Sequence, residues 1–149
     1  MAHKIIPKSY KWAGPLVDRV GPPKGIVEHH AAASRCTADV VHGWHLNNGW
    51  SGIGYHAFID KKGRIYRGRP WQKQGCHCLG ANDWMGICYE GNFQNEKMTT
   101  AQKLAGRWLT RRWKKAFKLG NKRVKGHRAM PGNSTACPGK NFPMKFIKG

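Results

Sequence analysis

Acidic residues are scarce in this chain of 149 residues. Seven Asp and Glu side chains stand against 27 Lys and Arg side chains, which leaves a formal net charge of +20. A field of that sign attracts polyanions and accelerates encounter with them, so we expect nucleic acid, anionic lipid or an anionic polymer of a bacterial envelope as a partner. The sequence has no zinc-finger spacing, RNP motif or helix-turn-helix pattern, and nucleic acid is therefore the least favoured of the three.

Long apolar stretches are also missing. Those present run for only a few residues, far below the ~18 that a membrane-spanning helix needs. Residues 1–24 contain no apolar region of the secretory type, so we expect no signal peptide. The cysteines are odd in number, which argues against a fully paired disulfide framework. They are Cys36, Cys76, Cys78, Cys88 and Cys137.

The length suits one domain. Four prolines break any periodic pattern in residues 1–24, which we interpret as an irregular N-terminal arm ahead of a domain over residues 25–149. That domain mixes the periodicities of strands and helices. Short strands are expected at 25–30, 53–60, 64–68 and 84–90, and helices at 37–47 and 100–118. This order predicts an α/β or α+β fold with a mixed sheet around one core.

The clearest helix, at residues 100–118, has Thr99 or Thr100 as its expected N-cap. Its apolar residues follow the spacing of one buried face, with a cationic face opposite. A cationic helix face is usually only solvated, although here it would also add to attraction for an envelope polymer. The predicted buried face consists of Ala101, Leu104, Ala105, Trp108, Leu109, Trp113, Ala116 and Phe117.

Three side chains have the chemistry of a zinc site. His29 lies at the end of a predicted strand, and His127 and Cys137 lie in a later loop rich in Pro and Gly. Two imidazoles and one thiolate leave a fourth coordination position for water, as in catalytic rather than structural zinc sites. The chain has eight His residues, so chance triples are numerous, and a purely structural role for each His stays open at this point.

The contexts of these residues are more specific than their spacing. In order along the chain, the segments are IVEHHAA at 26–32, GWSGIGYH at 49–56, GRIYRGRP at 63–70 and GHRAMPGNSTACPG at 126–139. Together they resemble the N-acetylmuramoyl-L-alanine amidase family, which includes phage T7-type lysozymes and peptidoglycan recognition proteins. The segment GCHCLGAN at 75–82 is also similar to that family. The resemblance extends over about residues 25–140.

The resemblance implies a single α/β domain with a central mixed β-sheet flanked by helices and a zinc-containing groove. It assigns Zn²⁺ to His29, His127 and Cys137, and the presence of Cys137 favours an active enzyme over a recognition protein. Tyr55 and Thr135 are the implied catalytic residues. Another branch of the superfamily has a Glu where this chain has Cys88, so Tyr55 would take over that role.

The implied reaction is hydrolysis of the amide bond between the lactyl group of N-acetylmuramic acid and L-alanine of the stem peptide, as in an endolysin or autolysin. We expect peptidoglycan as the partner of a monomer, with His77, Asn82 and Arg69 as substrate contacts. Without a signal peptide, the protein would reach the cell wall by release from a host cytoplasm during lysis. The alternative is a non-catalytic basic domain that binds peptidoglycan or another polyanion.

Overall fold

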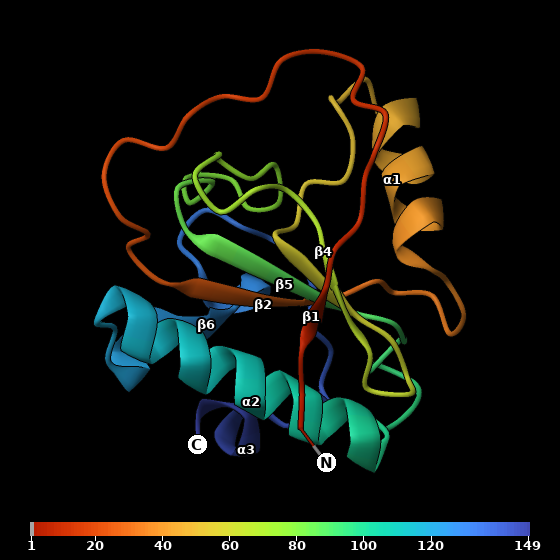
Figure 1. Ribbon diagram of the computed structural model, residues 1–149. Coiled ribbons are helices and arrows are strands. Elements are labelled where there is room, and N and C mark those ends of the chain that lie inside the picture. Colours follow the sequence, from red (N-terminus) through yellow and green to blue (C-terminus); the bar gives the residue numbers. More distant parts are fainter. Residues whose placement is uncertain (1) are drawn as a thin grey trace.

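The computed structural model describes residues 2–149, which form a six-stranded sheet with helices on both faces (Figure 1). The strands are β1 (Ile5–Ile6), β2 (Ile26–His30), β3 (Ala57–Ile59), β4 (Ile65–Arg67), β5 (Met85–Tyr89) and β6 (Val124–Gly126). Their order across the sheet is β1-β4-β3-β5-β2-β6. β3 and β4 pair antiparallel, as the predicted hairpin requires, and the other neighbours pair in parallel. The predicted mixed α/β sheet is confirmed.

The helices separate onto the two faces. α2 (Thr100–Phe117) and the short α3 (Met144–Lys148) cover one face, and α1 (Ala38–Asn47) covers the other (Figure 1). Two short 3-10 helices, η1 (Asn121–Arg123) and η2 (His127–Ala129), flank β6. No helix in residues 2–149 combines the length and apolarity needed to cross a membrane.

Threonine caps both long helices. Thr37 accepts a hydrogen bond from the backbone N–H of Val40 and starts α1, and Thr99 does the same for Gln102 and starts α2. Each side-chain oxygen satisfies one of the N–H groups that a first helical turn leaves without a partner. Of the two caps considered for the second helix, Thr99 is the one used.

Side chains along the central strands alternate between the two faces of the sheet. Ile87 and Tyr89 of β5 pack in the core under α2, whereas Cys88 packs in the cluster beneath α1. The register pairs His29 with Cys88, so the His29 side chain also faces away from α2. The sheet therefore separates the metal-ligand candidates from α2.

The N-terminal arm is not irregular throughout. Ile5 and Ile6 extend the sheet as edge strand β1, in register with Ile65 and Tyr66 of β4. Two consecutive β-branched residues suit a pleated edge, and Pro7 ends the strand because proline has no N–H to donate to the ladder.

The buried face of α2 agrees with the predicted one at Ala105, Leu109 and Trp113 and differs elsewhere. It is rotated about the helix axis, so that it includes polar side chains and leaves Leu104 48% exposed. Gln102 Nε2 donates to the backbone carbonyls of Ile59 and Glu90, which satisfies the amide N–H groups of this side chain inside the core. These hydrogen bonds explain why an apolar pattern alone misplaces the face. The buried set is Gln102, Ala105, Gly106, Leu109, Thr110 and Trp113.

Candidate metal centre

His29, His127 and Cys137 converge at one end of the sheet. One ligand atom of each lies within 4.8 Å of the ligand atoms of the other two, and Cys137 Sγ is 3.6 Å from His29 Nδ1. The parallel register explains the two histidines, because Gly126 of β6 pairs with Glu28 of β2 and each is followed by a ligand candidate, His29 in β2 and His127 at the start of η2. The cluster combines a strand end, the start of η2 and the loop after it.

Backbone hydrogen bonds hold the third candidate in place. The backbone N–H of Arg128 donates to the carbonyl of Cys137 at 2.8 Å, which closes the loop between Arg128 and Cys137. The backbone N–H of His30 donates to Cys137 Sγ at 3.4 Å. An N–H aimed at sulfur favours the thiolate form that binds metal.

Hydrogen bonds to neighbouring side chains set the tautomers of His29 and His127. His77 Nε2 lies 2.9 Å from the carbonyl of Trp84, which can only accept, so this nitrogen carries the proton. His77 Nδ1 must then accept from His29 Nε2 at 2.8 Å. His127 Nε2 likewise donates to Asn133 Oδ1 at 2.9 Å. His29 therefore keeps Nδ1 as an unprotonated nitrogen, as metal ligation requires, and in His127 the hydrogen bond to Asn133 leaves Nδ1 as the nitrogen available to a metal ion.

The electrostatics of the cluster suit a bound cation. Burial, and then the neighbouring imidazoles of His77 and His127, lower the pKa of His29 well below its usual value, so its ring is neutral. Burial raises the pKa of the Cys137 thiol to about 12, and no carboxylate belongs to the cluster. Two imidazoles and a thiol that ionises on metal binding form a donor set typical of zinc with one open position.

The two implied catalytic residues lie beside the cluster. The ring centroids of Tyr55 and His29 are 4.9 Å apart. Burial raises the pKa of Tyr55 well above its usual value, with smaller contributions from the thiols of Cys88 and Cys137. The phenol therefore stays protonated and can donate a hydrogen bond. Thr135 is exposed, and its Oγ1 accepts from the backbone N–H of Cys137 at 3.2 Å.

The predicted substrate contacts have structural hydrogen bonds. His77 is buried with both ring nitrogens bonded, and Asn82 Oδ1 accepts from the backbone N–H groups of His77 and Cys78. Arg69 is buried, with Nε donating to the carbonyl of Ile53 and Nη1 to that of Gln74. His77 is the one of the three that directly contacts a metal-ligand candidate.

Sequence reasoning missed the partners of the ligands. Asn133 orients His127 and also bonds the backbone of Leu79, which ties the late loop to the loop that contains His77. The position of Asn133 between His127 and Cys137 in the sequence could have suggested its contact with the site. The contact of the Trp84 carbonyl could not have been predicted, because any residue type supplies a backbone carbonyl.

An α/β domain in which two imidazoles at the ends of parallel strands meet a thiol from the following loop defines a candidate single-site zinc protein. The family model described as N-acetylmuramoyl-L-alanine amidase matches residues 19–140. The chain belongs to this family, and the resemblance seen in its motifs is confirmed.

Relatives and solved structures agree with this assignment. The structure of N-acetylmuramoyl-L-alanine amidase LysC from Clostridium intestinale URNW is similar with a TM-score of 0.92 and 38% identity, covering 99% of this chain and 96% of that one. Peptidoglycan recognition protein 1 of Mus musculus is 32% identical over 150 residues, which cover 91% of this chain and 81% of the mouse protein. Peptidoglycan-recognition protein SC2 of Drosophila melanogaster is 30% identical over 127 residues, or 78% of this chain and 68% of the fly protein.

Proposed function

We propose that this protein is a zinc-dependent amidase, an endolysin or autolysin that hydrolyses the bond between the lactyl group of N-acetylmuramic acid and L-alanine in peptidoglycan. The observation that carries the proposal is the convergence of His29, His127 and Cys137, with ligand atoms within 4.8 Å of one another. Membership of the amidase family and similarity to solved amidases support the same reaction. The proposed site of action is the bacterial cell wall, reached during lysis of a host.

The proposed chemistry divides between the metal and two side chains. When bound, zinc would lower the pKa of a water molecule toward neutrality and polarise the scissile carbonyl. Tyr55, a protonated phenol against the His29 ring, orients the attacking water. The Thr135 hydroxyl donates to the carbonyl oxygen as negative charge develops there. On this assignment Tyr55→Phe retains zinc and slows turnover.

His77 is proposed to orient a metal ligand, and its contacts do not favour the substrate role expected from the sequence. Its Nδ1 accepts from His29 Nε2 and its Nε2 donates to the Trp84 carbonyl, which leaves the ring no free donor. Partners of this kind set ligand orientation, and losing one lowers metal affinity about 10–100-fold. We expect His77→Ala to weaken zinc binding by that factor, measured by competition with a chromogenic chelator.

Asn82 and Arg69 are still proposed as substrate contacts, but only through the parts of their side chains that are not already hydrogen-bonded. Asn82 is half-buried and uses its Oδ1 to hold the loop, so its amide NH₂ is the group proposed to meet the stem peptide. Arg69 would meet a stem carboxylate only through the part of its guanidinium that does not bond Ile53 and Gln74. Its first effect is to brace the loop below the site.

Hydrolysis of purified peptidoglycan tests the proposed function. Release of L-alanine amino groups is expected with zinc, lost in chelator and restored when zinc is added, and mass spectrometry of the digest identifies the bond that is cut. Cys137→Ala should lose both bound zinc and hydrolysis. Cys36→Ala is the matched control, because Cys36 is a buried free thiol outside the cluster. Full hydrolysis in chelator, or zinc bound normally by Cys137→Ala, contradicts the assignment.

The second candidate function is recognition without cleavage. Its support is the similarity, with a TM-score of 0.83 and 25% identity, to peptidoglycan recognition protein-LE, whose structure holds tracheal cytotoxin, a monomeric diaminopimelic acid-type peptidoglycan. A recognition domain would bind peptidoglycan fragments with zinc present and release no amino groups. The same digest therefore separates the two candidates.

A further inference from the structure

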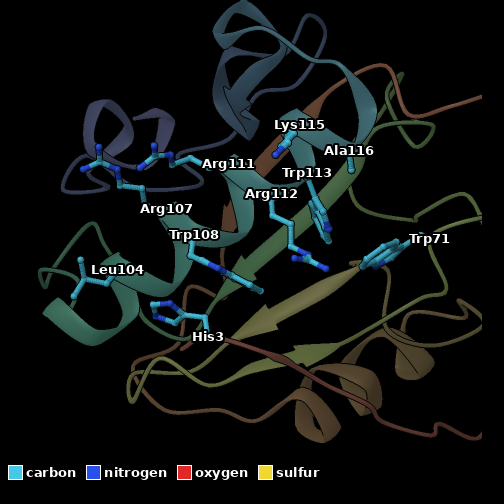
Figure 2. A pocket seen from close by; sticks show the side chains of 10 residues that line it. All are labelled: His3, Trp71, Leu104, Arg107, Trp108, Arg111, Arg112, Trp113, Lys115 and Ala116. Carbon is cyan, nitrogen blue, oxygen red and sulfur yellow. The ribbon is translucent and has the colours of Figure 1, made fainter. Parts of the chain in front are cut away.

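A long groove lies along the outer flank of α2, on the side of the sheet opposite the metal centre. Its volume is about 1110 Å³, and α2 supplies most of its lining, with Trp71 and His3 closing one side (Figure 2). The groove is distinct from the metal centre, since His29 points to the other face of the sheet while the inner side of α2 packs on this one. Nothing in the proposed amidase reaction uses it.

The groove is strongly cationic. Arg107, Arg111, Arg112 and Lys115 line it, and α2 contains no Asp or Glu. Positive charges this close raise the local potential and attract anions. The pKa of the neighbouring Lys114 is lowered, first by burial and then by the positive charges of Arg111 and Arg107.

No Asp or Glu side chain pairs with these cations within residues 2–149. Five acidic side chains form ion pairs with Lys or Arg outside α2. Glu28 is buried and accepts from Tyr89 and Thr110. Glu90 accepts from backbone N–H groups before α1 and in the β3–β4 turn. All seven Asp and Glu side chains are thereby engaged elsewhere, so the groove cations have no side-chain carboxylate as a partner.

Indole rings lie beside one of the guanidinium groups, that of Arg112 (Figure 2). Arg112 lies 5.4 Å from the centroid of Trp108, and Trp71 packs edge-on against Trp113 with centroids 5.8 Å apart. The buried indole N–H groups of Trp71 and Trp113 have no hydrogen-bond partner among the described residues, and neither has Arg107 Nε. Indole faces stack on sugar rings, while guanidinium forks bind phosphate oxygens. The half-buried Trp71 and Trp108 and the exposed Arg111 and Arg112 therefore offer both kinds of contact.

We propose that this groove binds an anionic cell-wall polymer built of sugars and phosphodiesters. The affinity for phosphodiester groups follows from the groove alone, whereas the choice of a wall polymer rests on the proposed function. A bilayer surface would favour protruding apolar side chains, but here the indoles line a hollow and Trp113 is fully buried at its floor. Binding through α2 holds the enzyme on the wall and leaves the metal centre on the opposite face free for peptidoglycan.

The test compares two charge-reversal pairs of equal charge. Arg111→Glu with Arg112→Glu changes two exposed groove residues, and Lys11→Glu with Arg35→Glu changes two exposed residues outside it. Binding to a purified, sugar-substituted glycerol-phosphate polymer is measured by calorimetry over a series of salt concentrations. We expect the groove pair to raise the Kd about tenfold or more and to flatten its salt dependence. The control pair should stay close to wild type.

Three outcomes overturn the proposal. They are absence of polymer binding by the wild-type protein, equal losses in both variant pairs, and a groove-dependent preference for phosphatidylglycerol vesicles or double-stranded DNA over the polymer. Hydrolysis of peptidoglycan stripped of phosphate polymers is measured in parallel and reports the amidase separately. The groove pair should lose more rate on intact walls than on stripped peptidoglycan. If the protein binds the polymer but hydrolyses neither substrate, the proposed amidase function is refuted and the proposed polymer-binding groove is still supported.

Discussion

A buried carboxyl group makes the stability of this protein depend on pH in an unusual direction. Glu28 lies in the core between the sheet and α2 with 0% exposure, and its two oxygens accept from the hydroxyls of Tyr89 and Thr110 at 2.8 Å. No cation pairs with it in the described residues. Burial raises its pKa from 4.5 to about 7, against the smaller opposing effect of the two hydrogen bonds. The folded state therefore holds this proton more tightly than the unfolded state.

The sign and size of the effect follow from proton linkage. Between pH 4.5 and pH 7 the folded protein binds one more proton at Glu28 than the unfolded chain, so stability falls as pH rises through this window. Each pH unit costs about 1.4 kcal/mol, and the total approaches about 3 kcal/mol above pH 7. Below pH 4.5 both states are protonated and the penalty is absent.

Glu28→Gln isolates this contribution, because glutamine has nearly the same shape and does not titrate. Urea unfolding in chelator, followed by tryptophan fluorescence from pH 4 to pH 9, gives the free energy of unfolding of each protein. We expect the variant to be more stable at pH 8 by about 2–3 kcal/mol, after allowing about 1 kcal/mol for an imperfect hydrogen bond. The advantage should disappear near pH 4.5. Parallel pH profiles for the two proteins would refute the reasoning.

Two further predictions concern the surroundings of the metal centre. A Cβ atom at Gly86 would lie 2.9 Å from ring carbons of His77, so Gly86→Ala should displace that ring and lower zinc affinity about tenfold. The control is Gly43→Ala in α1, where an added Cβ would meet nothing within 4 Å. This control should leave zinc binding unchanged. Burial lowers the pKa of His45 to about 4, so between pH 6.5 and pH 4 only the unfolded chain takes up a proton at this residue. As pH falls through this window, the free energy of unfolding of the wild type should therefore decrease by about 2 kcal/mol relative to that of His45→Asn. Asparagine keeps an acceptor for Gly54 N–H, and urea unfolding that shows no divergence contradicts the second prediction.

Elements with strong local signals were predictable. The threonine cap and periodic pattern located α2, and the Lys-Lys-Gly turn located the β3–β4 hairpin. Apolar spacing predicted only part of the buried face of α2, because Gln102 and Thr110 are buried through hydrogen bonds to groups of β3 and β2. β1 was missed because two residues make too short a pattern to detect.

The sequence by itself determined the ligand types and the family motifs, since residue identity decides which atoms can bind zinc. The tertiary structure decided which nitrogen each histidine offers, because the tautomers of His29 and His127 depend on His77 and Asn133. It also decided that the cations of α2 remain without Asp or Glu partners in the described chain. Composition reports a net charge of +20, but only folding determines where the seven acids go and where positive charge is left unopposed.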